Sequence, residues 1–435
     1  MKFICRKPGE KSIEIIKRDQ KVISQSLTRE YSFVFKMAKG CHVWDVDNRK
    51  YLDFGAGVAV VNIGHNNPVI KKAMLKQIKY GVHCGFSDFY AEVPVRFSEY
   101  LVSFMPNKEL NNVFLSNSGT EAIEAGLKLA KWHTSKKYVI AFENSFHGRT
   151  MGSLSLTKSK PVQRERFGPF LPVRHVPYPY YYRMKMDKEE CSNYCLDELE
   201  KEIKKLKDDL AGLFIEPIQG EGGYVVPPKS FVKGVRKLCN EHNVLLCDDE
   251  VQAGCYRTGK FLGIENFDVK PDVVCLSKSI GGGIPIGVTI ANKSLMDWPA
   301  GSHANTMGGN LLACATGIES LRYMKEKRLG ENAIRVGKHM LKRLNEIKDK
   351  FEIIGDVRGI GLMIGIEIVK DKKNRLANAE DRSKILCNAS EKGLILLPAG
   401  KSVIRICPPL TLNKGQADLG IDILEDAIKD AKEVA

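Results

Sequence analysis

The chain has 435 residues, more than one hydrophobic core ordinarily organises, so we expect two domains. With 43% hydrophobic and 27% charged residues, the composition is that of an ordinary globular protein, and no apolar run reaches the length of a membrane span. The net charge is +15, but lysine and arginine are mixed with acidic residues, as in EIKKLKDD. This mixing is typical of solvated helix faces and argues against a nucleic-acid-binding protein.

The amino-terminal residues and the cysteines favour a cytoplasmic protein. The start, MKFICRKPGEKS, lacks the apolar segment of a signal peptide. Single cysteines within apolar runs are expected to be buried and reduced; examples are Cys239, Cys247, Cys275 and Cys314. Cys191 and Cys195 could form a disulfide or bind a metal, although two unbonded loop cysteines are favoured. No other cysteine or histidine cluster has zinc spacing, so we expect no metal.

The first hundred residues predict a hairpin followed by helices. Residues 1–40 are charged and contain one amphipathic stretch. HVWDVDNRKYLDF alternates around an Asp-Asn turn and predicts a β-hairpin. The glycine-rich GAGVAVVNIGHNNP comes next and predicts a tight connection. From Pro68 to Phe104 the pattern is helical.

A strand at Val113–Leu115 leads into a strong helix start, SNSGTEAIEAGLKLAKWH. Ser118 and Glu121 have the spacing of a capping box ahead of an apolar stripe. The backbone N–H groups at Gly119 and Thr120 would then point out of the helix, where they can bind a phosphate. Because every capped helix has such groups, this signal is weak by itself.

The middle of the chain predicts further strands that end in chemically useful residues. Tyr138–Phe142 is followed by ENSFHGRT, in which an aromatic residue could stack on a ring. Residues 158–207 are interpreted as an insert with one charged helix. Leu213–Ile215 ends in EPIQGEGG, and a helix is expected at 229–242.

Two short apolar runs, Val244–Cys247 and Asp272–Leu276, predict strands buried on both faces. The first leads to Asp249, and the second leads to Lys278 and three glycines. In a parallel α/β sheet, ligands bind at the carboxyl ends of the strands. A lysine there can form a Schiff base with an aldehyde cofactor, and a carboxylate facing a pyridine nitrogen keeps it protonated. The pair therefore suits a pyridoxal 5'-phosphate enzyme.

The strings DEVQAG and SKSIGGGIPIG resemble those of the class III (ω-type) aminotransferases of pyridoxal phosphate fold type I. The resemblance extends from about Trp44 to Thr411. It implies an α/β fold with a mostly parallel central sheet in a large domain, at 66–326. Residues 327–435 and the segment 1–65 would form a smaller α+β domain. There, helices are expected around 341–347, at 380–392 and at the end of the chain, with strands in GIGLMIGIEIV and at 394–397 and 403–406.

The same resemblance implies a role for each site residue. Lys278 would be the catalytic base and cofactor lysine. The other cofactor-binding residues would be Ser118, Gly119, Thr120, Phe146, His147, Glu216, Asp249, Val251, Gln252 and Thr306. Substrate would be bound by Val58, Arg149, Glu221 and Arg405. Because Thr306 matches a threonine that reaches the phosphate of the other subunit, the resemblance also implies a homodimer with shared sites.

The function implied is transfer of an amino group from an ω-amino acid, such as 4-aminobutyrate or ornithine, to 2-oxoglutarate. The donors of this group are not separable by these residues. Amino-acid racemases of the same fold carry the same motifs and remain an alternative, because they also use the lysine.

Overall fold

The computed structural model describes residues 7–433, and these divide into two compact units. One unit contains the described residues up to Asn67 together with those from Glu331 onward. The other unit is continuous, from Pro68 to Gly330, and contains the strand that ends in Asp249 and the strand that leads to Lys278.

The Pro68–Gly330 unit is built on a seven-stranded sheet, in the order β4-β10-β9-β8-β7-β5-β6. Neighbouring strands from β9 to β6 are parallel, while β10 is antiparallel to both β4 and β9. The mostly parallel sheet inferred from the sequence is therefore confirmed. The strands are β4 (Asn112–Ser116), β5 (Tyr138–Phe142), β6 (Val173–Val176), β7 (Leu210–Ile215), β8 (Leu245–Asp249), β9 (Val273–Leu276) and β10 (Gly287–Ala291).

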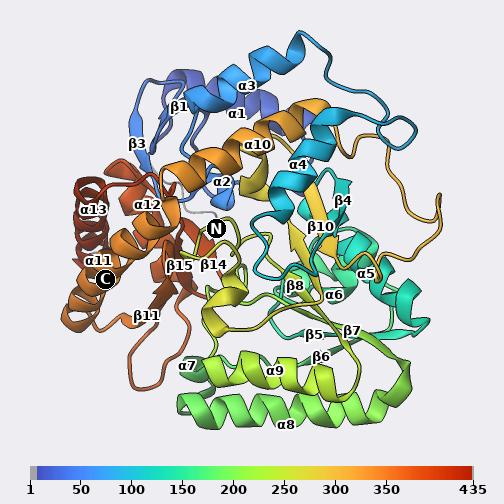
Figure 1. Cartoon of the computed structure of the whole chain (residues 1–435). Helices are drawn as coiled ribbons and strands as arrows, with labels where there is room; N and C mark the ends of the chain where they lie inside the picture. Colours follow the sequence, from blue (N-terminus) through green and yellow to red (C-terminus); the bar gives the residue numbers. More distant parts are fainter. Residues whose placement is uncertain (1–6, 434–435) are drawn as a thin grey trace. The chain divides into compact units, whose positions relative to one another are not determined.

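Helices connect and cover these strands, and the adjacent helices α8 and α9 can be followed in Figure 1. They are α3 (Pro68–Ile78), α4 (Glu92–Val102), α5 (Gly119–Thr134), α6 (Met151–Leu156), α7 (Tyr181–Met184), α8 (Lys188–Leu206), α9 (Lys229–Glu241) and α10 (Leu311–Glu326). Four short 3₁₀ turns are η1 (Pro161–Gln163), η2 (Lys207–Asp209), η3 (Gly263–Phe267) and η4 (Lys278–Gly281).

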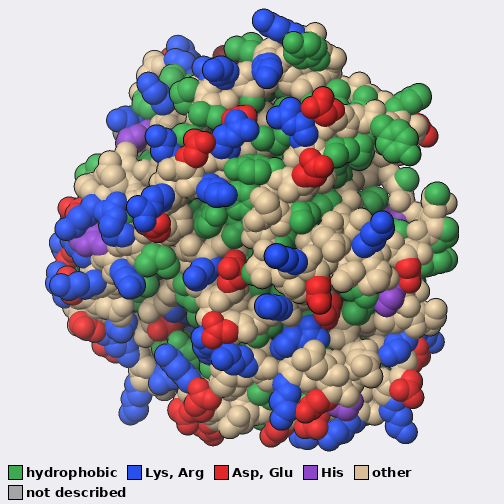
Figure 2. Space-filling view, viewed as in Figure 1, with side chains coloured by type: hydrophobic (Ala, Val, Ile, Leu, Met, Phe, Trp, Pro, Cys, Tyr) green, Lys and Arg blue, Asp and Glu red, His purple; other side chains and the backbone are tan. Residues whose placement is uncertain are grey.

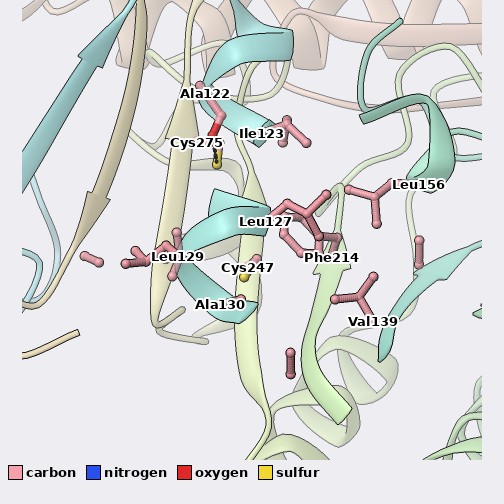
Figure 3. Close-up of a cluster of buried hydrophobic side chains, with 14 residues drawn as sticks. Ala122, Ile123, Leu127, Leu129, Ala130, Val139, Leu156, Phe214, Cys247 and Cys275 are labelled. Carbon is pink, nitrogen blue, oxygen red and sulfur yellow. Dashed lines mark hydrogen bonds between the residues drawn. The ribbon is translucent and has the colours of Figure 1, made fainter. Parts of the chain in front are cut away.

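The core of this unit lies between helix α5 and the central strands. Ile123, Leu127 and Ala130, on one face of α5, pack with Phe214 of β7 and Cys247 of β8 (Figure 3). Every residue of β7 and β9 is buried, which explains their unbroken apolar sequences. This packing fixes the amino end of α5 beside the carboxyl ends of the strands.

Several sequence interpretations of this unit were incomplete. The helical region after Pro68 is two helices, since α3 ends at Ile78 and α4 begins at Glu92. Residues 158–207 are more than an insert, because β6 is an edge strand of the central sheet. Cys191 and Cys195 are buried on helix α8 and are free, so the reading of two loop cysteines was wrong. The Cys191 thiol donates to the sulfur of Met184 at 3.4 Å.

The other unit combines helices with two four-stranded sheets, β1-β2-β3-β13 and β11-β12-β15-β14. The predicted hairpin is confirmed as β2 and β3, which pair antiparallel. The residues of GIGLMIGIEIV do not form one strand, because they turn between β11 and β12, which also pair antiparallel. The strands are β1 (Phe35–Lys39), β2 (His42–Asp45), β3 (Lys50–Asp53), β11 (Ile354–Ile360), β12 (Met363–Ile368), β13 (Leu394–Ile395), β14 (Leu397–Ala399) and β15 (Val403–Ile406). The helices are α1 (Glu10–Val22), α2 (Ala56–Ala59), α11 (Leu329–Lys350), α12 (Ala379–Glu391) and α13 (Lys414–Glu433).

Charged side chains of both signs are mixed on the face drawn in Figure 2, where lysine and arginine lie among aspartate and glutamate. Many form short-range pairs along helices, such as Lys204 with Glu200 at 2.6 Å. Among the residues that the structure describes, no helix combines the length and apolar character needed to cross a bilayer.

Candidate active site

The residues at the carboxyl ends of β8 and β9 form the centre of the candidate site. Asp249 is the last residue of β8 and lies opposite Cys275 of the parallel strand β9. Lys278 follows β9 after one intervening residue, Ser277. The carboxylate and the lysine therefore leave the sheet at the same edge, as the sequence predicted.

The backbone around Lys278 is held in an uncommon conformation. Lys278 has φ 49°, in the left-handed region that costs a residue with a side chain of order 1 kcal/mol or more. Neighbouring contacts hold it there: the Ser277 hydroxyl donates to the carbonyl of Ile286 at 2.6 Å, and Ser320 donates to the carbonyl of Ser279 at 3.2 Å. Gly282 closes the turn at φ 64°, and a Cβ there would lie 2.5 Å from a side-chain carbon of Ile70. The surrounding structure thus fixes where the lysine side chain starts.

Asp249 is paired with His147. The Nδ1 atom of His147 lies 2.7 Å from Oδ2 of Asp249, and both side chains are buried. The other carboxylate oxygen accepts the N–H of Val251 at 3.0 Å. Burial alone would lower the pKa of His147, but the hydrogen bond and charge of Asp249, together with the charge of Glu216, raise it above its usual value. The arrangement favours an imidazolium beside a carboxylate.

Glu216 joins two loops beneath this pair. One carboxylate oxygen accepts the N–H of Phe146 at 2.9 Å, and the other accepts the N–H of Gly220 at 2.9 Å. Burial raises the pKa of Glu216 to about 7, with the charge of His147 opposing the shift and that of Asp249 adding to it. Glu216 therefore positions the loop that carries Phe146 and the loop that carries Glu221.

The amino end of α5 lies next to the Asp249 loop. Ser118 caps the helix by accepting the N–H of Glu121 at 3.3 Å, while the Glu121 carboxylate accepts the N–H of Asn117. The cap is confirmed, but the reciprocal bond reaches Asn117 rather than Ser118. A Cβ at Gly119 would lie 2.8 Å from Val251, so only glycine lets the backbone and Val251 approach this closely. The first N–H groups of a 16-residue helix therefore face the candidate site.

The Thr120 hydroxyl belongs to a cluster on the far side of this turn. It lies 2.8 Å from the hydroxyl of Thr150 and 2.6 Å from that of Ser153. Since these contacts occupy its side chain, the backbone N–H of Thr120 is the group left to bind an anion.

Aromatic, amide and cationic side chains complete the site in this unit. The guanidinium of Arg149 lies 5.8 Å from the ring centroid of Phe146. The amide oxygen of Gln252 accepts the hydroxyl of Tyr224 at 2.8 Å, which leaves its NH₂ group to donate. Thr306 is exposed in the loop before α10.

Glu221 has a neighbour that the sequence did not suggest. Its Oε1 atom lies 2.6 Å from Nζ of Lys160. Both residues belong to the Pro68–Gly330 unit.

Two predicted substrate residues lie in the other unit. Arg405 is on β15, where it pairs with Gly365 and Leu397, and is 7% exposed. Val58 lies in α2, in which all four residues have positive φ; its own value is 62°. A β-branched residue in this region is strained, and such strain is concentrated at functional sites.

A family model described as aminotransferase class-III matches residues 24–428. The chain belongs to the class-III aminotransferases. It is 38% identical over 408 residues to an acetylornithine aminotransferase of Clostridium acetobutylicum, covering 92% of this chain and 97% of that one. It is 37% identical over 428 residues to a leucine/methionine racemase of Thermococcus litoralis, covering 97% and 96%. An amine transaminase from an uncultivated Pseudomonas species, solved with pyridoxal phosphate bound, superimposes with a TM-score of 0.89 at 30% identity, over 94% of this chain and 98% of that one.

The aminotransferase is thus a pyridoxal-phosphate-dependent transaminase of fold type I. Its own residues fit that cofactor. A lysine and a carboxylate share one sheet edge, a helix amino terminus offers N–H groups for the phosphate, and an amide donor is fixed nearby. No group of acidic, histidine or cysteine side chains suited to a metal occurs within residues 7–433.

Sequence reasoning missed the residues that hold the aminotransferase site in place. Tyr224 orients Gln252, Lys160 pairs with Glu221, and Thr157 accepts the N–H groups of His147 and Gly148 at 2.9 and 3.2 Å. The two residues of each contact are 9 to 61 positions apart in the sequence, and no motif spacing signals any of these contacts. Only the position of Tyr224, just after EGG, offered a clue.

Proposed function

We propose that the enzyme transfers an amino group from an ω-amino acid, such as 4-aminobutyrate or an ornithine-like donor, to 2-oxoglutarate. The observation that supports this proposal is the burial of two residues of opposite charge. Arg405 is an almost fully shielded arginine, and Glu221 is an acid whose side chain is only 17% exposed. The likeness to an acetylornithine aminotransferase also supports an ω-amino donor.

The cofactor, when bound, supplies an electron sink for the carbanion that forms beside the transferred amine. In the proposed arrangement Ser118 caps the helix whose Gly119 and Thr120 N–H groups hold the phosphate. Thr306 of a second subunit would add a hydroxyl to the phosphate. Asp249, which is hydrogen-bonded to His147, would keep the proton on the ring nitrogen.

The remaining cofactor contacts hold the ring in place. Phe146 and Val251 would cover its two faces, and the NH₂ group of Gln252 would be available to donate to its phenolic oxygen. Glu216 fixes the backbone of Phe146. These residues would contribute to the rate by holding the cofactor in the orientation that places the reacting carbon near Lys278.

Lys278 would perform the proton transfer. Its amine would take the proton from the carbon that bears the donor amine and deliver it to the carbon on the cofactor side of the same nitrogen, so that the amine is left uncharged again. Proton transfer by a positioned base is worth about 10²–10⁴-fold in rate. The fixed backbone at Lys278 keeps the amine in reach of both positions.

The two substrates pose different electrostatic demands. An ω-amino donor brings no carboxylate next to its reacting amine, whereas 2-oxoglutarate carries one next to its reacting carbonyl. The resemblance assigns Glu221 to the donor half of the reaction, in which a carboxylate at that place is disfavoured. In the other half, Arg405 would bind the α-carboxylate of 2-oxoglutarate and Arg149 the distal one. Val58 would line the pocket.

Glu221→Ala is expected to lower the ratio of kcat/KM for ω-amino donors to that for α-amino donors about tenfold, or about 1.4 kcal/mol. The reason is that the variant would lose the acid that disfavours donors carrying a carboxylate beside the reacting amine. Steady-state kinetics with 4-aminobutyrate and glutamate measure the ratio. Glu143→Ala, which removes a more exposed acid paired with Lys158, is the control. An unchanged ratio in Glu221→Ala would contradict this proposed role of Glu221.

The function itself is tested by a screen of amino donors against 2-oxoglutarate, with glutamate as the measured product. Acceptance of at least one ω-amino acid among 4-aminobutyrate, ornithine and N-acetylornithine is expected. If only α-amino acids react, the proposed donor class is wrong.

Racemisation of an α-amino acid is the second candidate, favoured by the likeness to a relative named as a racemase. A racemase must return the proton to either face of the α-carbon and needs no oxo acid. The enzyme incubated with an L-amino acid alone distinguishes the two functions, since only a racemase then accumulates the D form.

A homodimer is proposed from the position of Thr306 and an exposed apolar surface beside it. Tyr80, Phe89, Tyr90 and Met307 are between 48% and 104% exposed. The two segments adjoin, because the N–H of Leu311 donates to the carbonyl of Val82 at 3.1 Å. Exposed aromatic clusters of this kind mark protein interfaces.

Mixing the variants Lys278→Ala and Thr306→Ala tests shared sites. In a mixed dimer one site would carry both changes and the other neither. Refolded or co-expressed mixtures are therefore expected to exceed the average activity of the two pure variants. Activity equal to that average would mean that each chain completes its own site.

A further inference from the structure

We propose that Met184, Cys191 and Cys195 form a binding site for a soft monovalent metal ion, copper(I), where helix α7 meets helix α8. The three residues lie within the Pro68–Gly330 unit, and none of them is assigned to the amino-transfer reaction. The inference therefore does not depend on which substrate the enzyme accepts.

The two cysteines lie on one face of α8. They are four positions apart on this helix, a spacing that places Cβ atoms about 5–6 Å from each other on the same side. Both residues are fully buried, and their thiols are hydrogen-bonded to each other. The same buried face continues with Leu199 and Ile203. Its first two positions thus carry sulfur where apolar side chains continue the packing further along.

Met184 adds a third sulfur from another element. The Cys191 thiol donates to the sulfur of Met184 at 3.4 Å. Met184 is the last residue of α7, which lies beside α8 (Figure 1). Lys185 follows in the left-handed region, with φ 58°, and ends the helix. Because Met184 is only half-buried, its thioether gives a metal ion a path from solvent to the two thiols.

Hydrogen bonds that involve no sulfur hold the start of α8. The carboxylate of Asp187 caps the helix by accepting the N–H groups of Glu189 and Glu190 at 2.8 and 3.0 Å. The hydroxyl of Ser230, on α9, donates to that of Ser192 at 3.1 Å. The backbone that carries the cysteines is therefore in place before any metal binds, so binding needs little further ordering.

The ligand types select the ion. Thiolate and thioether sulfurs are soft ligands that favour copper(I). Structural zinc takes four ligands, and in the part of the chain that the structure describes no three acidic, histidine or cysteine side chains come together to supply such a set. Copper(I) would replace two S–H bonds by two S–Cu bonds, release two protons to solvent and keep its oxidation state. Cys191 lies near the amino end of α8, where the helix dipole favours a thiolate.

A bound ion would join the end of α7 to α8. Since it would bind the folded chain, its binding free energy would add to the stability of the fold. The melting temperature of the wild type is expected to rise when copper(I) is loaded, and that of Cys191→Ser is expected not to rise. Equal rises in the two proteins would contradict the site.

The main test titrates the holoenzyme, without oxygen, with copper(I) held by the coloured chelator bathocuproine disulfonate. The wild type is expected to take a single copper(I) ion per chain from the chelator. Cys191→Ser and Cys195→Ser are each expected to weaken this binding by about 100-fold or more, because loss of a ligand exceeds the loss of an outer-shell partner. Met184→Leu keeps the bulk but loses the thioether, and about tenfold weaker binding is expected. Cys239→Ser changes a buried cysteine of α9 and is the matched control, with unchanged binding.

X-ray absorption at the copper edge identifies the ligands directly. Three sulfur neighbours are expected in the wild type, and one fewer in Met184→Leu. Copper bound only through nitrogen or oxygen would overturn the inference. A wild type that takes no copper(I) from the chelator, or a loss of binding in Cys239→Ser equal to that in Cys191→Ser, would do so as well.

Met184→Leu keeps the test decisive if the serine variants do not fold. Leucine retains the packing volume at a half-buried position, and both thiols remain. Unchanged copper(I) affinity and an unchanged number of sulfur neighbours in this variant would show that the thioether is no ligand, and would refute the three-sulfur site.

Discussion

Lys278→Ala is expected to lower kcat by about 10²–10⁴-fold and to abolish borohydride-dependent fixation of the cofactor to the chain. Lys278 has two proposed tasks, holding the cofactor and moving the proton. The methyl group of alanine can perform neither. Its left-handed backbone is held by contacts of Ser277 and Ser279 that alanine would keep. The loss should therefore be chemical rather than structural.

The measurements are kcat, visible absorbance and the mass of the chain after borohydride treatment. Lys260→Ala removes an exposed lysine from the same unit and serves as the control for loss of positive charge. Normal turnover by Lys278→Ala would remove the basis of the assignment.

Asp249→Asn is expected to lower kcat by about 10²–10³-fold, or about 3–4 kcal/mol, the range seen when one preorganised electrostatic group is removed. Asparagine keeps the shape of the side chain but cannot hold a proton on the ring nitrogen by charge. It also leaves His147 without its buried counter-charge, so weaker cofactor retention and a lower melting temperature are expected as well.

The neighbouring residue provides a stringent control. Asp248 is on the same strand and fully buried, but adjacent residues of a strand point to opposite faces. Burial, with the nearby charges of Glu250 and Asp249, raises the pKa of Asp248 well above its usual value, which favours the neutral form of its side chain. Asp248→Asn is therefore expected to change little charge, and turnover within about twofold of wild type is expected. Equal losses in the two variants would indicate a structural effect common to β8.

Local sequence patterns correctly predicted the elements whose residues fix their own conformation. The unbroken apolar runs before Asp249 and Lys278 gave β8 and β9, because a strand buried on both faces needs no polar alternation. Ser118 gave the start of α5, because a cap is a contact between residues three apart. Elements stabilised by distant partners were missed. The edge strand β6 depends on pairing with β5, and β11 turns back on β12 within one apolar stretch.

The sequence by itself determined the chemistry available: one lysine and one acid after two buried strands, and a phosphate-binding helix start. Only the tertiary structure decided which partners tune these groups. His147 reaches Asp249 across 102 positions, Phe146 reaches Glu216 across 70, and Lys160 reaches Glu221 across 61. The physical reason is that strand and helix patterns follow from local backbone and burial preferences, whereas ion pairs and hydrogen bonds between loops depend on how the sheet brings distant strand ends together.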